Sequence, residues 1–229
     1  MTAVPSVRLP GTRYLTGVPD TEKTVDFWSM QAMTIKDFEA NEEISDLRWV
    51  SVEEAHTMLT YAHDRGVVSA FAALPTVTGI AVLVRHAHAG SRKEWTGDDD
   101  HRPLDERGEQ QAAALGPLLS LFKPARVCAA PLARCIDTVA PIGLPVRTDT
   151  VFAEATGATP KAVADRLRSL VADHTRVVVS SQGGVIPAAL EAMRPPNASA
   201  TRTFTTPKGT GWVLSFNGTD LVAADPLAL

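Results

Sequence analysis

The sequence predicts an α/β fold, because three short apolar runs end in polar groups and are separated by helical patterns. The runs cover residues 79–84, 126–130 and 177–180. Unbroken apolar runs of this length are typical of buried strands, and strands that alternate with helices form a parallel sheet. In such sheets, ligands bind beyond the carboxyl ends of the strands. We therefore expect a three-layer α/β/α unit over residues 79–229 that gathers polar side chains at one edge of its sheet.

The segments between and after these runs carry helix and turn signals. Asp105 is expected to cap one helix, and Thr159-Pro160 is expected to start another. The buried faces of these helices are predicted from residues at helical spacing, namely Leu115, Leu118, Leu119 and Phe122 in the first and Val163, Leu167, Leu170 and Val171 in the second. Near the end, Asn217-Gly218 between two apolar runs is a strong hairpin signal.

The first apolar run ends on Arg85-His86, where a fixed cation and an imidazole lie next to each other in the chain. A neutral imidazole, with a reference pKa of about 6.5, can attack an electrophile without a separate base. This pair therefore predicts a phosphate group that is held by Arg85 and attacked by His86. A solvated strand terminus is the alternative interpretation of the same two residues.

The other two strand ends add polar groups to the same predicted edge. Pro131 fits the first position of a helix, which places Arg134 in the first turns of that helix. The third run continues through Ser181 into Gln182-Gly183-Gly184 before the next helix begins. We therefore expect an arginine and an amide to accompany His86.

This constellation resembles the histidine phosphatase superfamily, which has the phosphoglycerate-mutase-like fold. Members carry an Arg-His-Gly-like motif, a later helix arginine and a second histidine after a late strand, and the resemblance spans residues 79–229. It implies that His86 takes the phosphoryl group and passes it to water. Arg85 and Arg134 match the arginines that clamp the phosphate, and Glu154 matches the acid that protonates the leaving group. The resemblance implies no metal and no cofactor.

Two positions depart from the family pattern. Ala87 stands where most members have glycine, as in the small phosphohistidine phosphatases that resemble SixA, and residues 102–108 are also similar to that subgroup. Gln182 stands where the second histidine is usual. Hydrogen bonds to charged groups contribute about 1.5–3 kcal/mol against about 1 for neutral pairs, so an amide is a weaker partner than a protonated histidine. Because the Gln182 NH2 group can still donate to phosphate, we expect a weakened site, with a dead site as the alternative.

Other polar residues near this edge have two interpretations each. Arg92 and Arg102 could contact a polyphosphate, or they could pair with the acidic run Asp98–Asp100, which is expected to be a solvated loop. Lys208 precedes the last hairpin and is a weaker candidate for substrate binding. The pair formed by His86 and His88 lacks further ligands, so we expect no metal site.

Residues 1–76 are expected to form a separate region, because Pro75 and Gly79 punctuate the chain between two patterned parts. Ser51 and Glu54 have capping-box spacing and are expected to open a helix. The elements expected in this region are strands at residues 14–15 and 25–28, a turn at residues 17–20, and helices at residues 51–59 and 64–73. This layout resembles the rear half of a Nudix hydrolase, which is an α+β fold.

The catalytic Nudix box is missing from this region. Glu42-Glu43 and Glu53-Glu54 lack the surrounding Arg-Glu and Gly residues, so we expect solvated acidic faces rather than an Mg²⁺ site. The whole chain resembles an actinobacterial fusion of a MutT-type Nudix hydrolase with a histidine phosphatase domain, beginning after the Nudix box. A start codon assigned too far downstream and gene decay would both produce such a truncated Nudix-like segment. Nudix pyrophosphatase activity is not expected.

Composition and charge limit the partners. The chain has 229 residues, 45% of them hydrophobic, and its two cysteines, Cys128 and Cys135, are expected to be reduced core thiols. Residues 1–78 hold 6 Lys and Arg against 11 Asp and Glu, and residues 79–229 hold 16 against 15. This balance disfavours nucleic acid polymers and suits a small anionic substrate. No apolar run could span a bilayer and no signal sequence is evident, so a cytoplasmic location is expected.

Three functions remain open at the level of sequence. The first is a metal-independent phosphatase that transfers a phosphoryl group from a small phosphorylated molecule to His86, and the fusion resemblance favours a nucleotide. The second is a SixA-like protein phosphohistidine phosphatase. The third is a non-catalytic protein that binds phosphorylated ligands. An unpaired sheet edge in the first region would then bind a partner or form a homo-oligomer.

Overall fold

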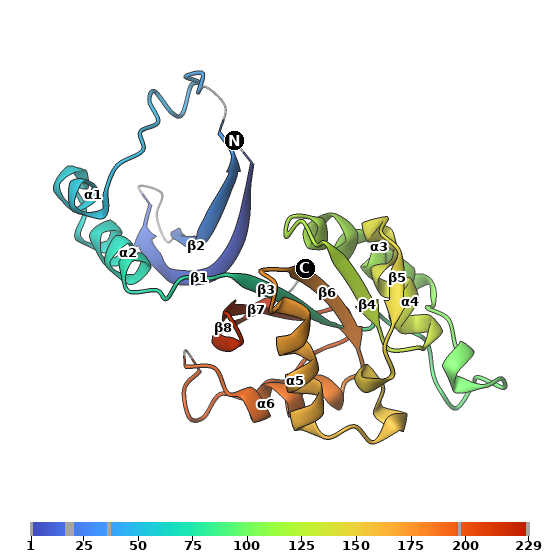
Figure 1. The fold of residues 1–229 in the computed structure, drawn as a ribbon. Helices are drawn as coiled ribbons and strands as arrows, with labels where there is room; N and C mark the ends of the chain where they lie inside the picture. Colours follow the sequence, from blue (N-terminus) through green and yellow to red (C-terminus); the bar gives the residue numbers. More distant parts are fainter. Residues whose placement is uncertain (1, 17–20, 36–37, 197, 228–229) are drawn as a thin grey trace. The chain divides into compact units, whose positions relative to one another are not determined.

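The computed structural model describes residues 2–16, 21–35, 38–196 and 198–227, and the turn expected at residues 17–20 lies outside them. The chain divides into two compact units, Met1–Pro75 and Thr76–Leu229 (Figure 1). No helix within the described ranges is both long enough and apolar enough to cross a bilayer.

The first unit contains a two-stranded antiparallel sheet and two helices, namely β1 (Thr2–Leu15), β2 (Glu22–Thr34), α1 (Val52–Met58) and α2 (Ala62–Ala72). Both strands are much longer than the short strands predicted. Pro5, Pro10 and Gly11 interrupt the pattern of β1, and its register against β2 shifts between Leu9 and Thr12. Because bulges and edge strands tolerate proline, such a strand is hidden from a search for strict alternation.

The predicted capping box at the start of α1 is confirmed. The Ser51 hydroxyl accepts a hydrogen bond from the Glu54 N–H (3.2 Å), and the Glu54 carboxylate accepts one from the Ser51 N–H (2.8 Å). Two backbone donors that the helix leaves unpaired are thereby satisfied. The second helix, α2, packs against both α1 and β1.

A six-stranded sheet forms the centre of the second unit. Its strands are β3 (Gly79–Arg85), β4 (Arg126–Ala129), β5 (Val146–Thr148), β6 (Arg176–Ser181), β7 (Gly211–Asn217) and β8 (Asp220–Leu227), in the order β5-β4-β6-β3-β7-β8. The four strands from β5 to β3 are parallel, and β7 and β8 are antiparallel additions. The predicted hairpin at Asn217-Gly218 joins β7 and β8, and Gly218 has the positive φ of 59° that such a turn requires.

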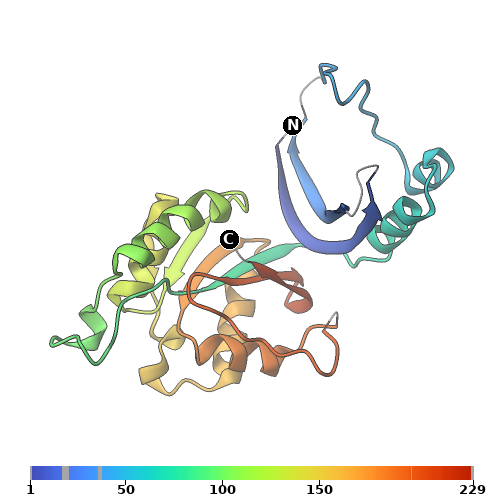
Figure 2. The same ribbon diagram turned by 180° about the vertical axis from the view of Figure 1, so that it is seen from behind.

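Helices cover both faces of this sheet. They are α3 (Glu106–Ser120), α4 (Ala133–Val139), α5 (Pro160–Val171) and α6 (Val185–Met193), with short 3-10 turns η1 (Asp99–His101), η2 (Ala140–Ile142), η3 (Thr150–Phe152) and η4 (Glu154–Thr156). Helix α3 packs against α4, and α5 packs against α6, so that the pairs lie on opposite faces (Figures 1 and 2). The predicted three-layer arrangement of this unit is therefore observed.

Most predicted helix and cap positions in the second unit hold, but the predicted start of α4 is wrong. Asp105 and Thr159 are the N-caps of α3 and α5. Pro131 is not the first helical residue, because α4 begins at Ala133 with Leu132 as its N-cap. The Leu132 N–H donates to the Ala130 carbonyl (2.7 Å), so a tight turn separates β4 from the helix. Both cysteines are free and buried, as expected.

Candidate active site at the carboxyl edge of the sheet

The strand order brings the predicted site residues together. Because β6 lies between β3 and β4 and is parallel to both, the carboxyl ends of the three strands meet at one edge. A cleft of ≈ 390 Å³ lies there, a size that suits a small molecule. It is lined by all eight residues predicted from the sequence, together with four others: Arg85, His86, Arg92, Arg102, Arg134, Glu154, Gln182 and Lys208, then Gly90, Asp99, Gly183 and Gly184.

His86 is buried at the floor of this cleft and is held by the backbone. The backbone N–H of His86 donates to the Ser181 carbonyl on β6 (3.0 Å), and the ring Nδ1 donates to the Ala87 carbonyl (2.7 Å). A proton on Nδ1 leaves the lone pair of the neutral ring on Nε2. Burial, joined by the charges of Arg134, Arg85 and Lys208, lowers the pKa of His86 to about 4. The imidazole is therefore neutral at neutral pH.

Arg85 is fixed beside His86 by one backbone acceptor and one glycine. Its Nη1 donates to the Thr206 carbonyl (2.8 Å), while its buried Nε has no hydrogen-bond partner among the described residues. A Cβ at Gly183 would lie 2.6 Å from the Arg85 Cζ, so a side chain there would push the guanidinium group out of its present position. A buried donor without a partner is costly, and an anion in the cleft would supply the missing acceptor.

Arg134 enters the cleft from the start of α4 and is 2% exposed. Its Nη1 donates to the Asp99 carbonyl (2.6 Å), and its Nη2 donates to Asp99 Oδ2 (3.0 Å). Like Arg85, it has a buried Nε without a hydrogen-bond partner within the described part of the chain. Two guanidinium groups in one cleft therefore each have an unused buried donor, which is the chemistry of an anion site.

Gln182, Glu154 and Gly184 also line the cleft and are linked to one another by hydrogen bonds. The Gln182 Oε1 accepts a hydrogen bond from the Glu154 N–H (2.8 Å), and Glu154 Oε1 accepts one from the Gly184 N–H (2.6 Å). With its oxygen occupied, the Gln182 amide has its NH2 group left to donate. Gln182 therefore lines the cleft with one amide oxygen already hydrogen-bonded within the protein.

Sequence reasoning missed the residues that hold the loop after His86. The Thr138 hydroxyl accepts from the Ala87 N–H (2.9 Å), and the Gln111 side chain accepts from the His88 N–H (2.9 Å). Asp105 caps α3 with one oxygen, and its other oxygen contacts His88 Nδ1 and accepts from the Gly90 N–H (3.0 Å). Only the helix cap was predicted at Asp105, because nothing in the sequence marks the second use of a carboxylate.

The N-terminal turn of α3 lies directly on this loop. A Cβ at Gly108 would lie 1.8 Å from the His88 carbonyl oxygen, which no side chain could tolerate. The glycine thus allows the helix to touch the backbone of the segment that follows His86. The His88 ring contacts Asp105, the N-cap of α3, and the His88 backbone packs against Gly108.

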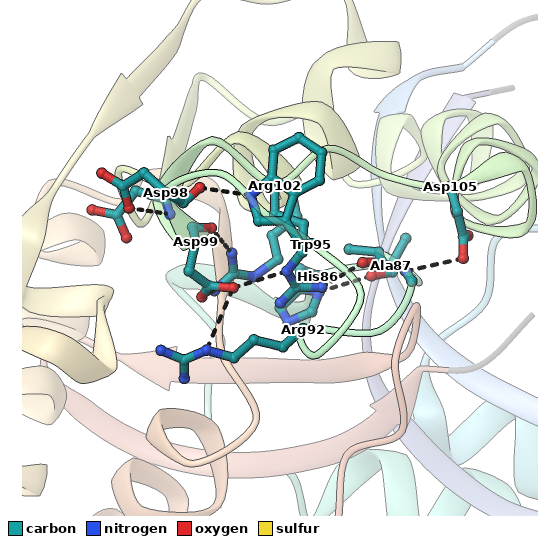
Figure 3. Close-up of polar contacts among 12 residues, drawn as sticks. His86, Ala87, Arg92, Trp95, Asp98, Asp99, Arg102 and Asp105 are labelled. Carbon is teal, nitrogen blue, oxygen red and sulfur yellow. Dashed lines mark hydrogen bonds and ion pairs between the residues drawn. The ribbon is translucent and has the colours of Figure 1, made fainter.

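The acidic run differs from its prediction. Asp99 is not a solvated loop residue, because its carboxylate lies 2.8 Å from Arg102 Nε, 3.0 Å from Arg134 Nη2 and 3.8 Å from Arg92 Nε (Figure 3). Burial acts in the opposite direction, but the hydrogen bond from Arg102 and the arginine charges lower the pKa of Asp99. Arg92 and Arg102 therefore pair with the acidic run, which was one of the two interpretations of these arginines.

Comparison with known proteins identifies the family. A family model described as the histidine phosphatase superfamily (branch 1) matches residues 81–159, a range that includes His86, Arg134 and Glu154. A protein of Mycolicibacterium smegmatis named 8-oxo-(d)GTP phosphatase is 34% identical over 225 residues, which cover 92% of this chain and 67% of that protein. The chain belongs to the histidine phosphatase superfamily. Because the family and this relative are both phosphatases, we conclude that the chain is a phosphatase enzyme.

Solved structures agree on the fold of this histidine phosphatase. The Agrobacterium tumefaciens protein named as a phosphohistidine phosphatase SixA has a TM-score of 0.53 and 20% identity, and the match covers 66% of this chain and 98% of that chain. The protein histidine phosphatase SixA complexed with tungstate has a TM-score of 0.51 and 18% identity, with 65% and 94% covered. At these identities the similarity concerns the fold alone.

Proposed function

We propose that this histidine phosphatase hydrolyses a small phosphorylated molecule, with a nucleotide as its substrate class, through a phosphohistidine formed on His86. The observation that carries the proposal is a neutral, buried imidazole in the same cleft as two guanidinium groups, each with a buried Nε that has no partner among the described residues. Such an arrangement combines a nucleophile with preorganised positive charge, so the residues themselves provide what phosphoryl transfer needs.

In the proposed reaction, Arg85, Arg134 and the Gln182 amide hold the phosphoryl oxygens. The Nε2 of His86 attacks phosphorus, and the bond between phosphorus and the ester oxygen breaks. Glu154, whose Oε1 is fixed by the Gly184 N–H, gives its proton to the departing oxygen. Water then attacks the phosphohistidine and gives a proton back to Glu154, which releases phosphate and restores the neutral ring.

Two observations support a small substrate over a phosphorylated protein. The relative that is 34% identical to this chain is named 8-oxo-(d)GTP phosphatase, which supports a nucleotide. The segment from Ser91 to His101 also lies against the arginines of the cleft through Asp99, where a protein substrate would need an open groove. A SixA-like activity on phosphohistidine remains the second candidate, and the similar fold supports it.

We also propose that the first unit is related to the rear half of a Nudix fold. Its antiparallel strands and its two helices support this relation. The match to the 8-oxo-(d)GTP phosphatase covers 92% of the chain and so extends over most of both units. No pyrophosphatase chemistry is assigned to this unit, because its Glu-Glu pairs lack the Nudix pattern.

Trapping the intermediate tests the proposal. Acid-labile, base-stable label should appear on His86 when the protein is mixed with γ-labelled nucleoside triphosphate or labelled p-nitrophenyl phosphate and quenched within milliseconds. The His86→Ala variant should carry no label and release no phosphate, while His174→Asn, at an exposed position far from the cleft, should match the wild type. EDTA should leave the rate unchanged. Label on another residue, or equal phosphate release by wild type and His86→Ala, would overturn the assignment.

A further inference from the structure

We propose that the Asp99 carboxylate is an internal competitor for the phosphate site, which an incoming phosphoryl group must displace from the arginines. The proposal rests on the function proposed above, because it concerns the same cleft. It assigns to Asp99 a role in setting the affinity for phosphate, which neither the sequence pattern nor the family match gives to this residue.

The contacts of Asp99 are those expected of a bound anion. Its two carboxylate oxygens pair with Arg102 and Arg134, and the exposed Arg92 lies slightly farther away (Figure 3). Its backbone carbonyl accepts a further hydrogen bond from Arg134 Nη1 (2.6 Å). A single residue therefore uses both Nη groups of the most buried arginine in the cleft. A phosphoryl group that contacts this face of Arg134 must compete with it.

The segment that carries Asp99 is built to move as a short piece. We call residues 98–101 the acidic strap; it consists of Asp98 and the single turn η1. Asp98 caps this turn through the Asp100 N–H (3.1 Å), and Trp95 Nε1 donates to the Asp98 carbonyl (2.9 Å). Beyond these local contacts, the strap is held to the cleft by the arginines. Hence its release breaks ion pairs and opens little apolar core.

A competitor and a positioning residue make opposite predictions. If Asp99 only held the arginines in place, its removal would loosen them and weaken phosphate binding. If Asp99 occupies the site, the apparent dissociation constant equals the intrinsic one divided by the fraction of molecules in which the arginines are free, so removal of the carboxylate tightens binding. A strap that covers the site nine-tenths of the time predicts about a tenfold gain. It would also promote release of product phosphate, because the carboxylate re-enters as phosphate leaves.

The test measures binding of inorganic phosphate by calorimetry to wild type, Asp99→Asn and Asp100→Asn. Asp100 is the matched control, because it is also an aspartate, follows Asp99 directly in the chain and forms no ion pair among the described residues. We expect Asp99→Asn to bind phosphate about tenfold more tightly and Asp100→Asn to stay within about twofold. Asp99→Ser serves as a second variant should the amide disturb the fold.

A second readout separates displacement from simple charge repulsion. Because Trp95 is hydrogen-bonded to the Asp98 carbonyl, movement of the strap should change Trp95 fluorescence when phosphate binds the wild type. The Trp95→Phe variant should lose that signal. Equal or weaker binding by Asp99→Asn, or tighter binding without a Trp95 signal, overturns the proposal and leaves the proposed function standing. If phosphate binds neither the wild type nor any variant, the anion site itself is refuted, and both proposals fall together.

Discussion

The floor and the rim of the cleft are built in different ways. The residues of the floor (Arg85, His86, Arg134 and Gln182) lie at the end of a buried strand or in the first turn of a helix. His86 and Arg134 are 6% and 2% exposed. The rim (Arg92 and Asp99) lies on a loop and a 3-10 turn, and the Arg92 side chain is 79% exposed. The difference teaches that the sheet fixes the groups proposed for chemistry, while side-chain pairing fixes the groups that control access.

The largest difference between the floor and the rim is expected when one arginine is removed from each. Arg134→Ala should lower kcat/KM for p-nitrophenyl phosphate by about 10²–10³, because a preorganised buried donor is lost. Arg92→Ala, on the exposed rim, should change it by less than about threefold, since exposed ion pairs contribute little. Equal losses in the two variants would show that the floor and the rim do not differ in this way.

Restoring a histidine at the family position tests whether the Gln182 amide weakens the floor. Gln182→His should raise kcat by about one to two decades, because a charged donor replaces a neutral one. The exposed Gln110→His on α3 is the control and should change nothing. An unchanged or lower kcat would mean that the bond between Gln182 and the Glu154 N–H has adapted the pocket to the amide.

Two glycine substitutions test whether close packing holds Arg85 in the floor. Gly183→Ala should lower kcat/KM by about tenfold, because the new Cβ displaces the Arg85 guanidinium from its place beside His86. Gly66→Ala, in α2 where nothing lies within 4 Å of the new Cβ, should leave activity unchanged. It should also stabilise the first unit by up to about 1 kcal/mol in thermal unfolding. Full activity in Gly183→Ala would contradict the close packing described here.

The charge state of His86 makes the stability of the protein depend on pH. With a folded pKa of about 4 against 6.5 for the free side chain, His86 stays neutral in both states above pH 6.5. Between pH 6.5 and 4, the His86 ring is protonated in the unfolded chain but not in the folded protein. The free energy of unfolding therefore falls by at most about 1.4 kcal/mol for each unit by which the pH is lowered. NMR titration of labelled histidines, assigned with His86→Ala, should place this pKa near 4. A midpoint near 6.5 would refute the buried neutral ring.

The floor could be predicted from the sequence because its residues lie at the end of an apolar strand or in the helix that comes after one. Strand ends meet at one edge whatever the details of packing, so Arg85, His86 and Gln182 were brought together by topology alone. Arg134 was placed correctly although the start of its helix was misjudged by two residues. An error of that size matters little to a side chain that reaches the cleft from the first turn.

The rim could not be predicted in the same way. Whether Arg92 and Arg102 meet a ligand or Asp99 depends on how residues 91–101 fold back, and no periodicity governs such a segment. The second use of Asp105 and the role of Thr138 depend on contacts between distant parts of the chain. Likewise, the bulges of β1 hid a long strand in the first unit.

The contact between Gly108 and the His88 backbone has a consequence for how this enzyme could diversify. Both ends of the intervening segment are anchored, one by the strand that ends just before His86 and the other by a capped helix. Insertions or deletions between these anchors would therefore remodel the entrance without shifting the imidazole. Relatives with other substrates are expected to vary there in loop length first, and to keep a residue without a side chain at the helix start.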